Sequence, residues 1–196
     1  MIEDSKKLKF RKKKLEDDNK KNRFGWIAVI FVLSFFLSVV MTLLSEGLMD
    51  ATNNIIVAFV VLISIIFIGI LFDIIGSAVI AADPKPLYAM ASRKRYGTKL
   101  AIKFLKNADK MASICNDVIG DTCGVISGTA VAYIITSLSF GENWIFETIY
   151  SLGLTSLVSS FMVAGKALGK KFAIKQSNNI IYRFAVVISV ITFRKG

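Results

Sequence analysis

Four long apolar runs separated by polar segments make up most of this chain. The first, FGWIAVIFVLSFFLSVVMTLL at residues 24–44, contains no charged side chain. Twenty-one helical residues are enough to cross about 30 Å of hydrocarbon. Three further runs lie at about 55–82, 118–140 and 144–168. The pattern predicts an all-α membrane protein with four transmembrane helices.

The segment between the second and third runs, residues 85–114, is basic and amphipathic. Its second half places apolar residues at three- and four-residue intervals, with lysines on the other face. Pro84 and Pro86 end the preceding helix, and Gly97 separates two short helices. We expect a helical hairpin at the cytoplasmic interface. Its membrane-surface basic residues are Arg93, Lys94, Arg95, Lys99 and Lys103.

Both chain ends predict cytoplasmic segments outside the bilayer core. Residues 1–23 are polar and rich in lysine, which indicates a basic N-terminal arm. The apolar centre of 172–194 is about ten residues long, too short to span, so we expect an amphipathic juxtamembrane helix there. Residues 24–196 then form one polytopic membrane domain.

The placement of positive charge predicts the topology. All 25 Lys and Arg residues fall at 6–23, 85–110 and 166–195, whereas the connections at 45–53 and 139–143 contain none. By the positive-inside rule, the N- and C-termini are expected in the cytoplasm, and the protein in the plasma or inner membrane. The net charge of +11 is therefore expected to face lipid headgroups, and we expect no nucleic-acid partner.

Composition narrows the chemistry further. Hydrophobic residues make up 54% of the chain and its mean hydropathy is +0.59, which is typical of membrane proteins. There is no histidine, which excludes histidine-based metal or catalytic sites. Cys115 and Cys123 lie eight residues apart, roughly 12 Å along one helix, too far for a disulfide. Without a nucleophile and base set, we expect no enzyme activity.

The stretch CNDVIGDTCGVISG at residues 115–128 combines acids with glycines. Gly120, Gly124 and Gly128 recur every fourth residue and share a helix face with two aspartates. Such spacing lets a neighbouring helix approach closely, so we call these three residues the glycine seam. Asp117, or Asn116 beside it, is of the type that caps a helix start. Asp121 lies one turn deeper, where a cap does not need it.

A third acid, Asp73, interrupts the second apolar run. Ser77 lies one turn further on the same face. One hypothesis pairs Asp73 with a lysine of residues 85–110. The other brings Asp73, Ser77, Gly120 and Asp121 together around one cavity, where carboxylate, hydroxyl and carbonyl oxygens suit a hard cation such as Mg²⁺ or Ca²⁺.

Residues 56–193 resemble the transmembrane domain of the CNNM/CorB/CorC family of magnesium and cobalt transport proteins. The resemblance lies in the basic stretch SRKRYGTKLAIKFLKNADKMASI, in VIGDTCG and in VAGKALGKKFA. It implies an ion pocket around Gly76 and Ser77, Gly120 and Asp121, and Gly165, and it implies a homodimer. The sequence departs from the family where family glutamates align with Val79 and Lys166, a family asparagine with Asp121, and a family proline with Gly169. The family's nucleotide-sensing CBS pair has no counterpart in these residues, and residues 24–44 add a helix.

Two functional hypotheses follow. The first is binding or transport of a Mg²⁺-like divalent cation at a cytoplasm-facing pocket. The second is a non-transporting membrane scaffold or accessory subunit that docks a partner through the glycine seam. Transport predicts a hydrated polar cavity at Asp73 and Asp121, whereas a scaffold predicts that lysines neutralise both acids in a dry helix bundle.

Overall fold

The computed structural model describes residues 25–49, 54–138 and 144–192. The basic arm predicted for 1–23 lies outside the described residues. The chain divides into two compact units, Met1–Phe36 and Leu37–Gly196. All regular secondary structure in the described residues is helical.

The described part of the first unit belongs to the helix Gly25–Met49, which continues into the second unit. Its large apolar side chains are mostly exposed, and Phe31 exposes 73% of its surface. Phe35 and Phe36 form an edge-to-face ring pair with centroids 5.8 Å apart. Residues 25–36 carry no charged side chain, and such apolar exposure is expected where lipid, rather than water, is the solvent.

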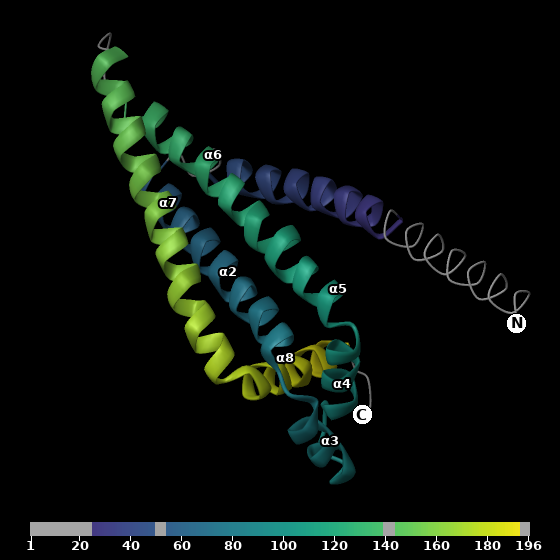
Figure 1. Cartoon of the computed structure of the whole chain (residues 1–196). Coiled ribbons are helices and arrows are strands. Elements are labelled where there is room, and N and C mark those ends of the chain that lie inside the picture. The colour runs from purple at the N-terminus through teal and green to yellow at the C-terminus, as the bar shows by residue number, and fades with distance from the viewer. Residues whose placement is uncertain (1–24, 50–53, 139–143, 193–196) are drawn as a thin grey trace, which may run out of the picture. The chain divides into compact units, whose positions relative to one another are not determined.

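Three long helical stretches form the body of the second unit (Figure 1). Helix α2 (Ile55–Ala81) packs against α7 (Trp144–Lys175) and against the stretch Ala108–Ser137. With Gly25–Met49, these are four helices among the described residues that are long and apolar enough to cross a membrane. The chain therefore has the features of a multi-pass membrane protein.

Side chains of these helices form two apolar clusters. One cluster is near the N-terminal end of α2, where Asn54 caps the helix by accepting a hydrogen bond from the Ile56 N–H at 2.9 Å. The Tyr133 hydroxyl donates to the Met49 carbonyl there, at 3.1 Å. The second cluster joins Ile65 of α2, Cys123 and Ile126 of the third stretch, and Met162 of α7.

The stretch Ala108–Ser137 starts about ten residues before the apolar run predicted at 118–140. It comprises α5 (Ala108–Ser113), a π-helix η1 (Ile114–Gly120) and α6 (Asp121–Ser137) without a break. Asn116 and Asp117 therefore lie inside a helix, and neither caps a helix start, which corrects the capping hypothesis. The polar CND sequence continues as a helix because its backbone bonds in the wider π pattern while it packs on α2.

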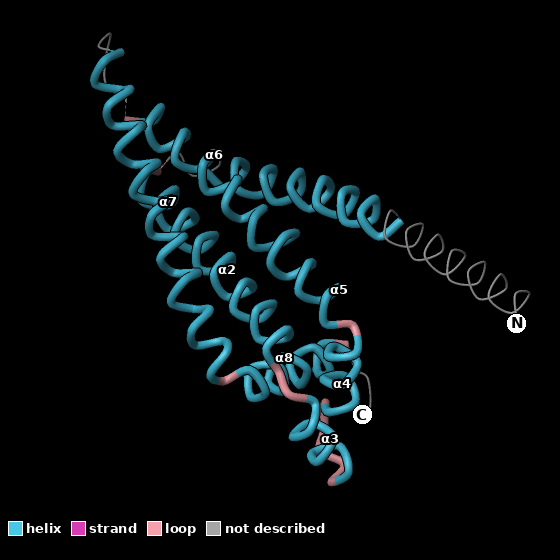
Figure 2. The backbone as a smooth tube through the Cα atoms, in the orientation of Figure 1, coloured by secondary structure: helices cyan, strands magenta, loops and turns pink. Residues whose placement is uncertain are grey.

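Three shorter helices lie at the end of the bundle where α2 and α7 terminate (Figure 2). They are α3 (Pro84–Ser92), α4 (Thr98–Lys106) and α8 (Ser177–Ile191), and we call them the helical platform. Helix α8 runs across the direction of α7 and packs on α2 and α4. At 15 residues it is too short to span a bilayer.

Candidate functional site

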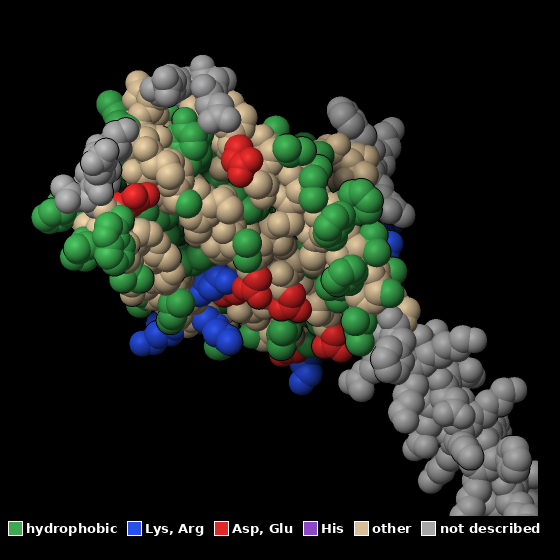
Figure 3. Space-filling model, turned by 90° about the horizontal axis from the view of Figure 1, so that it is seen from above, with side chains coloured by type: hydrophobic (Ala, Val, Ile, Leu, Met, Phe, Trp, Pro, Cys, Tyr) green, Lys and Arg blue, Asp and Glu red, His purple; other side chains and the backbone are tan. Residues whose placement is uncertain are grey.

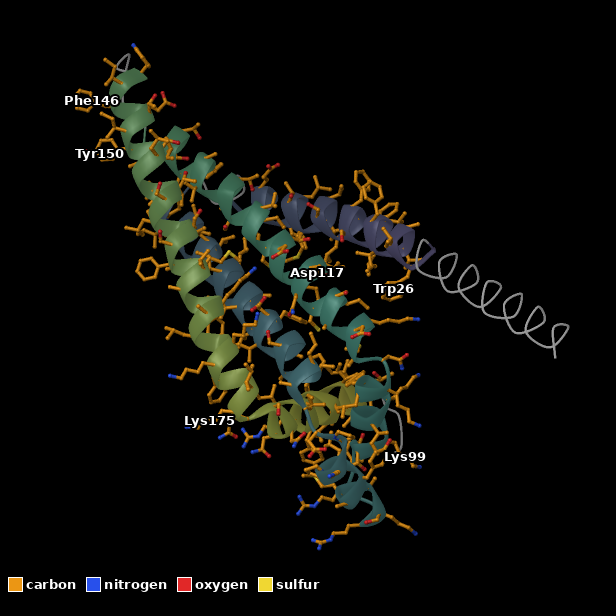
Figure 4. The ribbon with its side chains drawn as sticks, in the orientation of Figure 1. Trp26, Lys99, Asp117, Phe146, Tyr150 and Lys175 are labelled. Carbon is orange, nitrogen blue, oxygen red and sulfur yellow. The ribbon has the colours of Figure 1, made fainter. Side chains whose placement is uncertain are left out.

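Charged side chains from three spanning stretches converge towards the platform end of the bundle. Asp73 of α2 interacts electrostatically with Lys166 and Lys170 of α7, and with Asp117 and Asp121 of the third stretch. Figure 3 shows acidic and basic side chains next to one another on one part of the surface. Asp117, labelled in Figure 4, belongs to η1. We call these five residues the charge cluster.

Glycines allow the backbones of α2 and the third stretch to come close beside the charge cluster. A Cβ added to Gly120 would lie 3.6 Å from the Gly69 carbonyl oxygen and 3.9 Å from the Asp73 Cβ. A Cβ on Gly69 would meet Cys123 Cβ and Met162 Cε at 2.9 Å. Two helices can approach this closely only where side chains are absent from the contact.

The glycine seam is used in part within the chain. Gly120 faces α2, and Gly124 lies near Met162 of α7, whose sulfur would be 3.5 Å from an added Cβ. Gly128 has no described atom within 4 Å of an added Cβ and is exposed. The first two glycines therefore serve packing inside this chain, and only the third leaves room for another helix.

Lys166 neutralises one of the sequence-predicted site residues. Its Nζ donates to Asp121 Oδ1 at 2.9 Å, with the Lys166 side chain 23% exposed and that of Asp121 68% exposed. Lys166 is also the cation that interacts most strongly with Asp73. The lysines near Asp73 thus come from α7, and not from residues 85–110 as one hypothesis had it.

The remaining members of the site are oxygens without hydrogen-bond partners among the described residues. Asn116 Oδ1 is buried, contacts the backbone of α2 at Gly76, and accepts no hydrogen bond there. The Asp73 carboxylate, half-buried, has no ion pair within 4 Å and no hydrogen bond within the described part. Ser77 is buried one turn after Asp73. An ionised carboxylate within a transmembrane helix is unfavourable in free energy unless it faces polar groups or water.

Sequence reasoning considered Asn116 only as a helix cap and so missed its position facing α2. The sequence signal for such a position was that Asn116 is a polar residue next to Asp117. The π-helix that turns the Asn116 side chain towards Gly76 could not be predicted from the α-helical period of 3.6 residues. Cys115 and Cys123 are both free, as their spacing predicts, and both are buried.

The donor set fits a hard cation only in an open arrangement. Among the described residues, no group of three or more Asp, Glu, Cys or His side chains is close enough to hold a metal ion. One or two carboxylates with an amide oxygen and several waters is the arrangement that Mg²⁺ commonly takes, because Mg²⁺ dehydrates reluctantly. Asp73, Asn116 and Asp121 supply oxygens of these types.

No family model, no curated protein and no solved structure matches this chain. The resemblance to the CNNM/CorB/CorC family therefore rests on the sequence motifs alone. The charge cluster and the buried Asn116 Oδ1 are the features that bear on its function.

Proposed function

We propose that this chain is a multi-pass membrane protein that binds a hard divalent cation, Mg²⁺ being the model, beside the charge cluster. One observation carries the proposal: Asp73 and the buried Asn116 Oδ1 lack hydrogen-bond partners at the interface between α2 and η1. An unpaired buried amide oxygen and a half-buried carboxylate without a partner are both costly in a membrane interior, and a bound cation with its waters would satisfy both.

The residues have distinct roles in this proposal. Asp73 supplies the charge that attracts the cation, and Asn116 supplies a neutral oxygen ligand. Asp121 supplies a second carboxylate once Lys166 releases it. A partly exposed ion pair such as Lys166–Asp121 contributes only about 0–1 kcal/mol, so a divalent ion with a stronger field competes with Lys166 effectively.

Transport through this site and homodimer formation are the finer parts of the proposal. The CNNM/CorB/CorC resemblance supports both, since it implies an ion pocket in the same region and a paired domain. The exposed Gly128, with Ala132 and Thr136 one and two turns further on, gives α6 a face of small residues suited to a second copy.

A non-transporting scaffold is the second candidate, and the Lys166–Asp121 pair favours it. In that case the Lys166 ammonium takes the position of a metal ion and permanently compensates the acids. The chain would then bind a partner protein and no ion.

Thermal unfolding of the purified chain across Mg²⁺, Mn²⁺, Co²⁺ and Ca²⁺ tests the proposal. A ligand that binds only the folded state stabilises it by about 2.7 kcal/mol at one hundred times its Kd. We expect Asp73→Ala to weaken Mg²⁺ binding about tenfold or more, and Asp121→Asn to weaken it less. Lys166→Met, which removes the competing ammonium, is expected to strengthen binding.

Glu147→Gln is the matched control, since Glu147 is an acid at the other end of α7. It should leave the metal response unchanged. If no ion raises the melting temperature of the wild type or of Lys166→Met, cation binding is wrong. If only Lys166→Met responds, the scaffold is the correct reading and the site is latent.

A further inference from the structure

Three consecutive cations form the turn that joins α3 to α4 in the helical platform. Arg93, Lys94 and Arg95 are all exposed, and none forms an ion pair with a described residue. Lys94 adopts a positive φ of 52° and Gly97 a φ of 79°, so the chain reverses sharply. The reversal presents the three charges together at one corner of the platform.

The turn is fixed against the C-terminal half of α8. The Tyr96 hydroxyl donates to the Ser189 carbonyl at 3.1 Å. The Gly97 backbone lies so close to Val186 that an added Cβ would be 2.9 Å from its Cγ2 and 3.1 Å from its Cα. A turn held at two consecutive residues loses little conformational entropy when a ligand binds it.

The same half of α8 exposes apolar side chains. Val187, Val190 and Ile191 are 54%, 58% and 73% exposed. The opposite face, with Ala185 and Ser189, is buried against the platform. Exposed valine and isoleucine beside exposed arginine and lysine is the pattern of a helix at the boundary of headgroups and acyl chains.

The three helices of the platform contain no acidic residue. Residues 84–108 and 177–191 contain no Asp or Glu, whereas they contain Arg93, Lys94, Arg95, Lys99 and Arg183 among their cations. Lys99 lies at this platform end in Figure 4. The positive charge is therefore not compensated by the platform itself and attracts an anion.

We propose that the Arg93–Arg95 turn and the exposed C-terminal half of α8 together bind an anionic phospholipid of the surrounding membrane. The cations of the turn contact the headgroup phosphate, and Val187, Val190 and Ile191 contact its acyl chains. Guanidinium groups suit this role because they offer paired N–H donors to phosphate oxygens. The ligand class is a phosphate diester that carries a net negative charge and two acyl chains.

Native mass spectrometry of the full chain in detergent, with phosphatidylglycerol or phosphatidylcholine of identical acyl chains, tests the proposal. The test variant is Arg93→Gln/Arg95→Gln, which leaves the positive φ of Lys94 undisturbed. The control variant is Lys171→Gln/Lys175→Gln, which removes the same charge from exposed positions of α7. Each cation that contacts the bound headgroup contributes roughly a fivefold factor in binding.

We therefore expect phosphatidylglycerol to bind the test variant about 30-fold more weakly than the wild type, with the control within threefold of the wild type. Val187→Ser/Ile191→Ser should weaken binding of both lipids alike. Equal losses in the test and control variants would show a net-charge effect and overturn the proposal. Equal binding of the two lipids by the wild type, or unchanged binding by the serine variant, would also overturn it.

Two further measurements keep the proposal falsifiable. If inorganic phosphate displaces phosphatidylglycerol completely, the surface is a free-phosphate site and the lipid assignment is wrong. If the test variant does not fold, a salt titration of the wild type replaces it. Phosphatidylglycerol binding that does not fall as NaCl rises would contradict a site built on phosphate contacts.

Discussion

At the scale of single residues, the candidate site depends on the interaction partners of Asp73, Asn116 and Asp121. Asp121 has a lysine at 2.9 Å, whereas Asp73 and Asn116 Oδ1 have no hydrogen-bonding partner within the described part of the chain. All of them lie where glycines bring two backbones together. Their chemistry is therefore decided by close packing that a single substitution can disturb.

Gly97 is the position where substitution has the clearest expected cost. Its φ of 79° is left-handed, which costs an alanine about 1–2 kcal/mol, and a Cβ there would also press on the Val186 backbone. We expect Gly97→Ala to lower the melting temperature by about 2–8 °C, since 1 kcal/mol shifts it by about 2–4 °C in a protein of this length. Gly153→Ala is the control, because nothing described lies within 4 Å of its added Cβ. Scanning fluorimetry that finds both variants equally stable would contradict this account.

At the scale of elements, hydrophobic runs predict the helices well and their ends poorly. The second and fourth runs appear as α2 and α7, because their long uncharged stretches, residues 55–72 and 148–165, have few alternatives to a helix in lipid. Helix α7 ends at Lys175, beyond the predicted boundary near residue 168. Lysine has nearly the same helix propensity as leucine, so the helix continues past the end of the apolar run. The third helical stretch begins at Ala108, ten residues before its apolar run, because the residues between them are polar but still helical.

The candidate site shows the same division between local and tertiary information. An acid inside an apolar run stands out in the sequence, so Asp73 and Asp121 were recognisable. Lys166 is 45 residues from Asp121, and only the packing of α7 beside α6 brings them together. Its role as partner of Asp121 could not be read from helical periodicity, which relates residues on one helix only.

The buried thiols give a prediction for the helix Ala108–Ser137. Cys115 and Cys123 are 2% and 1% exposed, so maleimide should label neither in the folded protein and both after unfolding. Asp109→Cys places a thiol at an exposed position at the start of the same helix and should react at once. Mass spectrometry counts the labels. Rapid labelling of the folded wild type would show that the helix is rotated from the position described.

At the scale of the whole molecule, charge is segregated along the bundle of the second unit. Lys99 and Lys175 lie at the platform end, and Phe146 and Tyr150 lie at the other end of α7 (Figure 4). Lysine is costly in hydrocarbon, whereas aromatic residues favour the membrane interface. A bilayer therefore fits around the helices between these two ends.

This arrangement predicts a topology that can be measured in cells. In a Cys115→Ala/Cys123→Ala background, single cysteines replace Lys99, Lys175 or Trp144, all exposed. Because α6 and α7 cross in opposite directions between Lys99 and Lys175, these two thiols should share one side, and the positive-inside rule makes it the cytoplasm. A membrane-impermeant maleimide should then label intact cells at Trp144→Cys, and label the lysine replacements only after lysis. Labelling of Lys175→Cys in intact cells but not of Lys99→Cys would mean that α7 does not cross, and the charge cluster would then lie outside a bilayer.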